Sequence, residues 1–470
     1  MPAAPRSTPP PGRGHRDADL PPGTRRILHL DVDAFLASVE AAVHPELPEL
    51  KREPLVIGGS PTSRNLVMSC SYAARRFGIR PGMSLREAKR RCPRAIFRDG
   101  DSQAANRLRD EVTRVLLRFT PKVEVASIDD FYADLTGTAR LFGAAFDAAE
   151  RIRAAVRDDV SLPITIGVGA NRLFARLAGK LAKPGGIAEL LPGTELAFLH
   201  RLPVRELPGV GHAIGAKLER FQIRTVGELA LVPREILFAS FGRDGLVIFD
   251  RARGRDDRPV ETTHAEGENG VLTARPPKAL HREATFEPEE GRREVVLAML
   301  AYLIERALHR VRELGLAAGA LEVRVRYVET RARVEGSFAD GSPEGSSFGK
   351  RRAFARPTDA TDEAWLAAQR LFDELPRRRA LVKRIGVVLH DLKPSAGWQG
   401  RLFDLAGDGE PADSPRGSRD DRGRRLDAAV DALRAKLGFG RVLRGASTPL
   451  GETHPLSPDG YKLRTPSLNQ

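Results

Sequence analysis

The sequence predicts a multidomain protein of the α/β and α+β classes, and three parts of the chain support this prediction. Residues 27–190 alternate short apolar runs typical of strands with longer patterns typical of helices, which favours a mixed α/β domain. Residues 191–258 carry helical patterns separated by short Gly and Pro breaks, which favours a small all-α module. Residues 280–392 place strand and helix patterns in the order of a compact α+β domain.

The composition is that of a globular protein with a basic balance of charge. The 470 residues suffice for about two to four domains, and a hydrophobic content of 41% is ordinary for such proteins. Lysine and arginine number 76 against 62 aspartates and glutamates, so the formal net charge is +14. That charge suggests a polyanionic partner, and a solvated basic surface would explain it equally well.

The cysteines, the N-terminus and the apolar runs argue against several other classes of protein. Cys70 and Cys92 lack CxxC spacing and a histidine cluster, which predicts no zinc or disulfide framework and indicates a reduced, cytoplasmic setting. Residues 1–25 are rich in Pro and Arg and lack an apolar segment, so they are expected to be a disordered leader. The longest apolar run, residues 295–304, is far shorter than the roughly 18 residues of a membrane span, so no membrane partner is expected.

The first candidate site follows the apolar run that begins at Ile27. In "ILHLDVDAFLASVE" this run meets Asp31 and Asp33, for which a surface turn, a helix cap and a ligand pair for a hard cation are the three alternatives. Residues two apart on a strand share a face, and two like charges that close repel unless a cation or a donor neutralises them. The segment by itself favours the cap or the turn.

A second acidic cluster stands in "VASIDDFYADLTG", residues 125–137. Asp129 and Asp130 are adjacent there, and Asp134 follows them. Carboxylates in such an apolar setting are costly without a counter-charge, which favours a bound divalent ion. Together with Asp31, the cluster supplies three carboxylates suited to one or two Mg²⁺ ions.

Two further segments carry groups that bind phosphate in other proteins. "SCSYAARRFGIRPGM" supplies Ser69, Tyr72 and Arg75, and the last two are three residues apart and so on one helix face. "LAKPGGI" supplies Lys183 in a glycine-rich turn. Each is a weak signal alone, but beside an acidic metal site the set is typical of phosphoryl transfer.

Five segments together resemble one known family. They are, in chain order, "DVDAFLASVE", "VMSCSYAARRFGIRPGMSLREAKRRCP", "SIDDFYADLTG", "GVGANRLFARLAGKLAKPGGI" and "LPVRELPGVG". Their order and spacing resemble the Y-family DNA polymerases, most closely the bacterial DNA polymerase IV (DinB-type) group, and the resemblance covers residues 27–403. It implies a right-hand polymerase with palm, small fingers, helical thumb and little finger domains.

The resemblance also implies domain boundaries. They are palm at 26–34 and 102–190, fingers at 35–101, thumb with a helix-hairpin-helix at 191–258, linker at 259–279, little finger at 280–392, and a clamp-binding motif with a mostly disordered tail, containing one helix near 424–437, at 393–470. The order of these domains agrees with the pattern of strands and helices described above.

For the active site, the resemblance implies two Mg²⁺ ions, for which Mn²⁺ can substitute. Their ligands would be Asp31, Asp129 and Asp130 with the carbonyl of Val32. One ion would activate the primer 3′-OH for in-line attack on the α-phosphate, and the other would bind the triphosphate and the leaving pyrophosphate. The residues that would hold the β and γ phosphates of the dNTP are Ser69, Tyr72, Arg75 and Lys183. In this family the second aspartate of the first motif is not a ligand, which assigns Asp33 to the strand-to-helix turn.

The sequence departs from the family pattern at two positions. Asp130 stands where the family commonly has Glu, so the carboxylate is one methylene shorter and the metal geometry is altered. Leu36 stands where the family usually has a Tyr or Phe that excludes a 2′-OH. We expect weaker discrimination against ribonucleotides, unless neighbouring side chains close the gap.

Other segments predict contacts with DNA and with a sliding clamp. "LPGVG" resembles a helix-hairpin-helix turn whose amides at Gly209 and Gly211 bind a DNA phosphate, although a simple helix connection would also fit. Arg324 and Arg326 alternate with apolar residues and predict a cationic strand face that tracks the DNA backbone. The clamp-binding motif, in Q-x-x-L-F spacing, consists of Gln399, Leu402 and Phe403.

The sequence therefore predicts a template-directed, low-fidelity DNA polymerase that acts in translesion synthesis. Its partners would be primer–template DNA, dNTPs and a sliding clamp, and a cytoplasmic monomer is expected. A catalytically inactive relative that acts as a clamp-bound adaptor is the alternative, and loss of the acidic ligands would mark it. Asp31, Asp129 and Asp130 are all present, which favours the enzyme.

Overall fold

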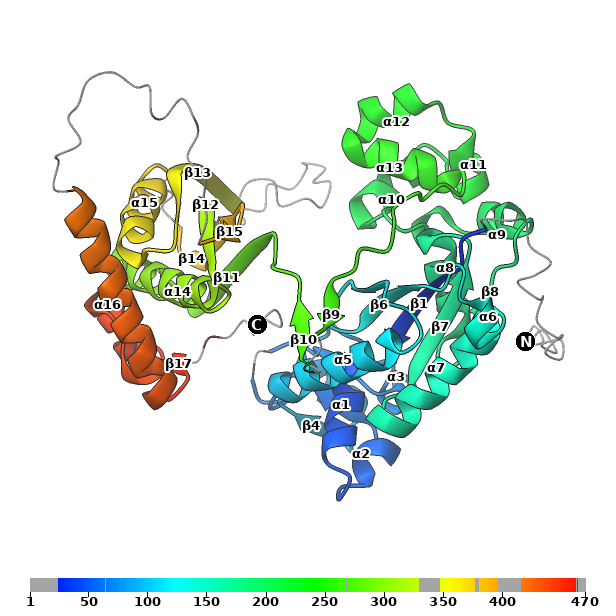
Figure 1. Ribbon diagram of the computed structural model, residues 1–470, viewed down its shortest axis with the longest axis horizontal. Helices are drawn as coiled ribbons and strands as arrows, with labels where there is room; N and C mark the ends of the chain where they lie inside the picture. The colour runs from blue at the N-terminus through cyan, green and yellow to red at the C-terminus, as the bar shows by residue number, and fades with distance from the viewer. Residues whose placement is uncertain are drawn as a thin grey trace. The chain divides into compact units, whose positions relative to one another are not determined.

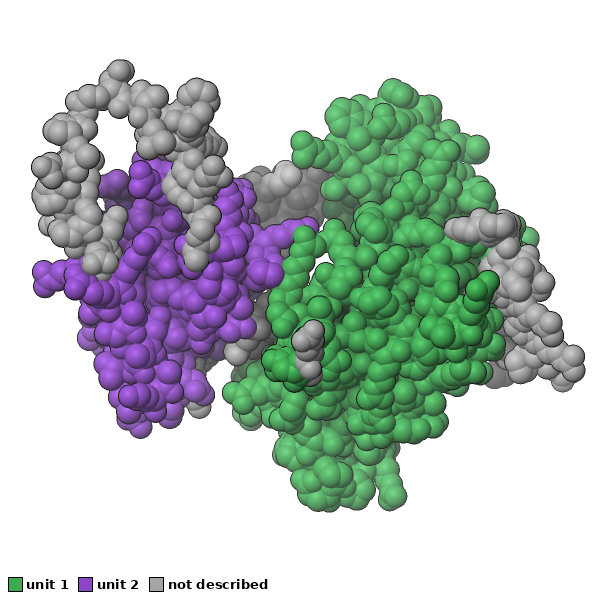
Figure 2. Space-filling model, in the orientation of Figure 1, with its two compact units in different colours: residues 1–275 green, residues 276–470 purple. Residues whose placement is uncertain are grey.

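The chain divides into two units, Met1–Arg275 and Pro276–Gln470, which Figure 2 colours separately. The computed structural model describes residues 24–63, 65–267, 269, 271–328, 347–376, 380–395, 416–461 and 463, with the backbone alone at 416–421. Most of the predicted leader, residues 1–25, lies outside these ranges.

A five-stranded sheet in the order β5-β6-β1-β7-β8 forms the centre of unit 1 (Figure 1). β1 pairs antiparallel with β6 and with β7, whereas β7 and β8 run parallel. The strands are β5 (Val123–Val125), β6 (Asp130–Asp134), β1 (Ile27–Val32), β7 (Ile164–Gly169) and β8 (Ile187–Glu189).

Different helices cover the two faces of this sheet. Leu28 and Leu30 of β1 lie in a core that α1, α5 and α7 share. The other face lies so close to α8 that a Cβ on Gly167 would be 2.0 Å from the carbonyl oxygen of Ala175. Only glycine permits this approach of helix to sheet. The helices of this region are α1 (Phe35–Val43), α5 (Ser102–Leu117), α6 (Ala139–Phe142), α7 (Ala145–Val160) and α8 (Arg172–Ala182).

A smaller three-stranded sheet in the order β3-β2-β4 occupies part of the predicted fingers. Ser71 and Ser84 are the N-caps of two helices in this region, because each side chain accepts a hydrogen bond from a backbone N–H of the first turn. The elements are α2 (Glu49–Arg52), β2 (Leu55–Ile57), β3 (Ser69–Cys70), α3 (Tyr72–Arg75), α4 (Leu85–Arg91) and β4 (Ile96–Arg98).

Helices alone make up the segment from Glu195 to Ala252. Leu199, Leu218 and Ile248 are fully buried in its core. A capping box between Thr225 and Glu228 starts α11. The side chain of Thr225 accepts a hydrogen bond from the backbone N–H of Glu228, and the side chain of Glu228 accepts one from the backbone N–H of Thr225. The helices are α9 (Glu195–Arg201), α10 (His212–Arg220), α11 (Val226–Ala230), α12 (Arg234–Phe241) and α13 (Arg243–Ala252).

The predicted linker, residues 259–279, contains secondary structure that the sequence did not predict. Strands β9 (His264–Glu266) and β10 (Leu272–Ala274) pair antiparallel. Thr263 fastens them to the central sheet, because its hydroxyl accepts a hydrogen bond of 2.8 Å from the backbone N–H of Val125. The boundary between the two units therefore falls after Arg275, late in the predicted linker.

Unit 2 has an antiparallel sheet in the order β11-β14-β12-β13, with β15 paired to β12. Helices α14 and α15 pack on it over a continuous hydrophobic core. The α+β order predicted from the sequence is confirmed. The elements are β11 (Ala279–Glu290), α14 (Arg293–Glu313), β12 (Leu316–Tyr327), β13 (Ser347–Thr358), α15 (Thr361–Asp373), β14 (Val382–His390) and β15 (Lys393–Pro394).

Residues 416–461 are folded and belong to unit 2, so the prediction of a mostly disordered tail is wrong for these residues. Helix α16 (Arg416–Leu437) is longer than the helix predicted near 424–437 and is followed by two 3₁₀ segments (Phe439–Arg441 and Gly445–Glu452) and the hairpin β16–β17 (Leu456–Ser457 and Gly460–Tyr461). Leu450 and Tyr461 join the core of unit 2.

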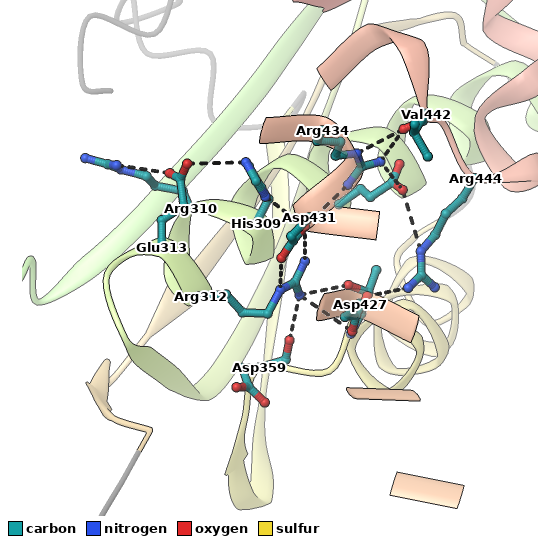
Figure 3. Close-up of polar contacts among 12 residues, drawn as sticks. His309, Arg310, Arg312, Glu313, Asp359, Asp427, Asp431, Arg434, Val442 and Arg444 are labelled. Atoms are coloured by element: carbon teal, nitrogen blue, oxygen red, sulfur yellow. Dashed lines mark hydrogen bonds and ion pairs between the residues drawn. The ribbon is translucent and has the colours of Figure 1, made fainter. Parts of the chain in front are cut away.

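Helix α16 is held to unit 2 mainly by charged side chains. Asp427 and Arg434 are 3% and 4% exposed, although both are charged. Figure 3 shows the contacts that they make with α14 and with the segment after α16. We call these side chains the ionic network: Glu305, His309, Arg312, Asp427, Asp431, Arg434 and Arg444.

No helix in the described part of the chain is both long enough and apolar enough to cross a membrane.

Candidate active site

Two of the predicted carboxylates face each other across neighbouring strands. Asp31, near the end of β1, is paired in register with Asp130, the first residue of β6. Both lie on the face of the sheet that α8 covers, since His29, two residues before Asp31, is 3.3 Å from a Cβ placed on Gly179 of α8. The Nζ of Lys183 lies 2.5 Å from Oδ1 of Asp31.

The pKa values show that nearby cations do not neutralise both carboxylates. Burial, with a further contribution from Asp130, raises the pKa of Asp31 to about 7, and Lys183 opposes that shift. Burial also acts to raise the pKa of Asp130, but His29, Arg176 and a hydrogen bond with Asp31 lower it to about 2. The pair therefore retains a proton near neutral pH, as expected for two close carboxylates that lack a sufficient counter-charge.

His29 leaves the pair incompletely satisfied. It is 4% exposed, and burial lowers its pKa, so the ring is neutral. Its Nε2 lies 3.2 Å from Oδ1 of Asp130, close enough to lower the pKa of that carboxyl. The geometry is not that of a hydrogen bond, and within the described residues neither buried atom has another hydrogen-bond partner. A buried carboxylate oxygen without a partner fits a position that a bound cation would complete.

The third predicted carboxylate is turned toward a different partner. Asp129 precedes β6, and its Oδ1 accepts a hydrogen bond of 2.5 Å from the hydroxyl of Ser127. Its backbone oxygen accepts a bond of 3.0 Å from the N–H of Val32, which holds the ends of the two strands together. Within the described ranges, no group of three or more His, Cys, Asp or Glu side chains is arranged to hold a metal ion. The oxygen donors suit Mg²⁺, but the structure assembles only two of them.

The predicted phosphate-binding side chains lie at the edge of the smaller sheet. Ser69 is on β3 and is 8% exposed, while Tyr72 and Arg75 begin and end α3. The guanidinium of Arg75 stacks on the ring of Tyr72, with Cζ 4.3 Å from the ring centre. Burial and the nearby carboxylate of Asp33 raise the pKa of Tyr72 to about 12, so its hydroxyl is a proton donor at neutral pH.

Asp33 is buried, contrary to the surface turn or helix cap predicted for it. It is 2% exposed, and the N-cap of α1 is Ala34, which makes no side-chain cap bond. Its carboxylate accepts bonds from the hydroxyl of Tyr72, the hydroxyl of Thr165 and the N–H of Gly185. Its place between strand and helix is as predicted, but these contacts were not.

A cavity of about 830 Å³ extends from Asp31 to the turn at 207–211. Gly209 in this turn has φ +98°, and a Cβ there would meet the guanidinium of Arg251 at 2.7 Å. Basic side chains outnumber acidic ones in the lining. The basic ones are Arg172, Arg176, Lys180, Lys183, Arg205, Arg251 and Arg258.

Three family models match the chain. The impB/mucB/samB family matches residues 30–180, its C-terminal domain matches residues 277–402, and the thumb domain of DNA polymerase-iota matches residues 205–256. DNA polymerase IV of Dehalococcoides mccartyi is 30% identical over 427 residues, which cover 91% of this chain and 98% of that protein. DNA polymerase IV 2 of Mesorhizobium japonicum is 38% identical over 313 residues, which cover 66% and 70% of the two chains.

The chain belongs to the Y family of DNA polymerases.

Solved structures agree with this assignment at the level of the fold. A Y-family DNA polymerase chimera, Dbh-Dpo4(243-245)-Dbh, has a TM-score of 0.65 at 23% identity and covers 78% of this chain and 99% of that one. An insertion ternary complex of Dbh DNA polymerase has a TM-score of 0.54. The predicted right-hand polymerase fold and the enzyme class, a DNA-directed DNA polymerase related to DNA polymerase IV and active in translesion synthesis, are confirmed.

The remaining predicted residues of this Y-family polymerase lie in separate places. Leu36 is in the first turn of α1 and is 8% exposed within the core of unit 1. Arg324 and Arg326 are on β12 of unit 2, where Arg324 is exposed and its Nε lies 2.6 Å from Glu322. The clamp-binding motif, Gln399, Leu402 and Phe403, lies outside the described residues.

Sequence reasoning missed several groups of the polymerase site. His29 could have been found, because it is two residues before Asp31 and therefore on the same face of β1. Arg176 and Lys180 are four apart on α8 and both line the cavity, a spacing that places them on one helix face. The sequence around Thr165 and Gly185 has no pattern that indicates a contact with the site.

Proposed function

We propose that the polymerase adds dNTPs to a primer 3′-OH by two-metal phosphoryl transfer, with low fidelity, on damaged templates. The observation that carries this proposal is the facing pair Asp31 and Asp130, two carboxylates that lie opposite each other beside a cavity whose lining is mostly basic. Such a pair suits divalent cations that bring a triphosphate with them.

In this proposal the metal ligands are Asp31, Asp129, Asp130 and the carbonyl of Val32. When bound, the two ions would activate the 3′-OH and stabilise the leaving pyrophosphate. Asp129 would exchange its hydrogen bond with Ser127 for a metal ion. Asp130 replaces the usual glutamate, but the register of β6 sets its carboxylate directly opposite Asp31. The number of ions and the choice between Mg²⁺ and Mn²⁺ are part of the proposal.

The chain's own contribution to nucleotide binding is a set of donors for the β and γ phosphates. Tyr72 offers a neutral hydroxyl, Arg75 a guanidinium and Lys183 an ammonium, while Ser69 offers a hydroxyl at the end of the smaller sheet. Lys183 is already beside Asp31, so a phosphate held at that carboxylate through a cation would be within its reach.

Primer–template DNA is proposed to contact the basic cavity lining and the turn at Gly209 and Gly211. Arg324 and Arg326 would add backbone contacts from unit 2, so affinity should fall steeply with salt. A sliding clamp bound through Gln399, Leu402 and Phe403, and a monomeric state, complete the proposal.

The replacement at Leu36 bears on the choice of sugar. Leucine cannot present the flat ring that excludes a 2′-OH in relatives, so we propose that ribonucleotides are also incorporated. Leu36→Tyr is the matched variant, which should reduce use of rNTPs and leave use of dNTPs intact.

The deciding experiment is primer extension on an undamaged template with Mg²⁺ or Mn²⁺, with dNTPs or rNTPs, beside an Asp129→Ala control. Extension by the wild type alone supports the polymerase. Absence of extension under every condition would favour the inactive clamp-bound adaptor. Extension with dNTPs but not with rNTPs would refute the proposed role of Leu36.

A further inference from the structure

The carboxylate of Asp33 joins three separate parts of unit 1. Its Oδ1 accepts a bond of 3.1 Å from the hydroxyl of Tyr72 on α3. Its Oδ2 accepts bonds of 2.8 Å from the hydroxyl of Thr165 on β7 and from the N–H of Gly185, in the turn after α8. The N–H of Gly185 also lies 2.8 Å from the hydroxyl of Thr165.

Two of these three parts carry proposed phosphate-binding groups. Tyr72 is itself one of them, and Arg75 stacks on its ring. Gly185 is two residues beyond Lys183 in the same turn. The position of its backbone therefore helps to fix the direction in which the Lys183 side chain points. On its other side the carbonyl of Gly185 accepts a bond of 2.9 Å from Arg153, which leaves the turn little freedom.

Asp33 is itself held rigidly. Its N–H donates to the carbonyl of Pro163 at 3.0 Å, and its own carbonyl accepts a bond of 2.6 Å from the hydroxyl of Ser38. The side chain is 2% exposed, and Thr165 is fully buried. A carboxylate held in this way can fix the positions of groups that are far from it in the sequence.

We infer that Asp33 is a positioning residue for the incoming nucleotide, which holds Tyr72 and the Lys183–Gly185 turn in the geometry that receives the β and γ phosphates. The inference rests on the proposed function, because it requires a triphosphate substrate. A tyrosine hydroxyl has one proton, so the bond from Tyr72 to Asp33 orders the empty site and is exchanged for a bond to phosphate, while the bond from Gly185 persists.

This role requires an acceptor but not a negative charge, which distinguishes it from metal binding. In Asp33→Asn the amide oxygen can accept from Thr165 and Gly185, and the amide NH₂ can donate to Tyr72. In Asp33→Leu a side chain of similar size accepts nothing, so both Tyr72 and the turn lose their anchor. Asp31, a proposed ligand two residues earlier, requires its charge, so Asp31→Asn is the matched comparison.

The test is steady-state primer extension with each of the four dNTPs, together with the Kd for primer–template DNA and the melting temperature of each variant. For Asp33→Leu we expect KM for dNTP to rise about tenfold or more, by the same factor for all four bases, with kcat and the DNA Kd nearly unchanged. Asp33→Asn should keep KM within about threefold of the wild type, whereas Asp31→Asn should abolish extension.

The outcomes separate the inference from the proposed function. Absence of extension by the wild type overturns the proposed function itself. An active wild type with Asp33→Asn as inactive as Asp31→Asn would make Asp33 a ligand and overturn the inference. An unchanged KM in Asp33→Leu, with a loss confined to melting temperature and the active fraction, would also overturn it, because that pattern marks a merely structural side chain.

Discussion

The two units each contain a group of charged side chains that are largely buried, and one carboxylate of each group has its pKa shifted in the opposite direction to that of the other. In unit 1, burial raises the pKa of Asp31 to about 7, Asp130 adds to that shift, and Lys183 opposes it. In unit 2, burial also disfavours charge on Asp431, but His309 and Arg312 lower its pKa to about 2. Figure 3 shows Asp431 between these two partners.

The difference lies in the number of partners that each carboxylate has. Asp427 accepts from the N–H of Thr361 at 2.9 Å and contacts two arginines, and Glu305 lies 2.6 Å from Arg434 with both side chains 2% exposed. The ionic network is therefore close to neutral and complete. The acidic pair of unit 1 is incomplete, which costs stability and leaves a position for cations. The same residue types thus build a structural joint in one unit and a reactive site in the other.

Removal of one carboxylate of the acidic pair should have the largest effect. Asp31→Asn and Asp130→Asn keep the shapes and remove the charges, so single-turnover extension should fall about a thousandfold or more, as loss of a metal ligand removes several kcal/mol of transition-state stabilisation. Asp134→Asn is the control. Asp134 lies on the same strand and is 9% exposed, and within the described residues its carboxylate contacts the N–H of Thr136 and the ammonium of Lys122. Full activity of both pair variants would show that this pair is structural too.

Removal of one partner of the buried ion pair should be the next largest effect. Arg434→Met removes the nearest cation from the buried Glu305 and leaves Arg444 at 3.5 Å. The loss should cost about 3–5 kcal/mol of unfolding free energy, whereas adding Glu305→Leu should recover much of it. Burial already raises the pKa of Glu305 beside Arg434, and loss of the arginine should raise that pKa further. Denaturant unfolding followed by the fluorescence of Trp365 on α15, in a Trp398→Phe background, measures it. A double variant as unstable as the single one would show that the pair itself stabilises the fold.

In the presence of a chelator, Asp431 and Asp31 should make the stability of the protein depend on pH in opposite directions. The pKa of Asp431 is lowered, so its contribution of about 2 kcal/mol is present above pH 4 and is lost as the pH falls from about 4 to about 2. The pKa of Asp31 is raised, so its own contribution to stability is greatest below about pH 4 and declines as the pH rises from about 4 to about 7. Asp431→Asn and Asp31→Asn should each flatten only its own range in thermal unfolding. Slopes of the same sign in both ranges would contradict the comparison.

The sequence was sufficient for the parts of the site that depend on local pattern. The apolar run at Ile27 predicted β1. The cost of carboxylates in an apolar setting predicted a shared site for Asp31, Asp129 and Asp130, and the register of β1 and β6 brings Asp31 and Asp130 together. Asp33 was misjudged because its partners Thr165 and Gly185 are 132 and 152 residues away. Such contacts depend on how strands and turns meet in three dimensions.

Residues 416–461 show a second limit of prediction from sequence patterns. The spacing of Leu426, Leu433 and Leu437 predicted a helix correctly, yet these leucines are 51%, 47% and 56% exposed. The side chains of α16 that are buried are Asp427 and Arg434, and Asp431 is partly buried. Each of the three contacts a residue of α14 more than 100 residues earlier. Periodicity gives the helix, but which face is buried depends on the charges of the surface that it meets.

The smallest effect on stability is expected from substitution of a second arginine on α16. Arg424 is 61% exposed at its side chain, and its Nε lies 3.4 Å from Asp359, at the rim of the ionic network. Exposed pairs contribute little because water screens them and both side chains lose mobility, so Arg424→Met should change the free energy of unfolding by less than about 0.5 kcal/mol. Measured beside Arg434→Met in the same denaturant series, this variant separates burial from residue type. Equal losses at the two positions would mean that α16 is held by its total charge and that the burial of Arg434 against Glu305 is not what fixes it to unit 2.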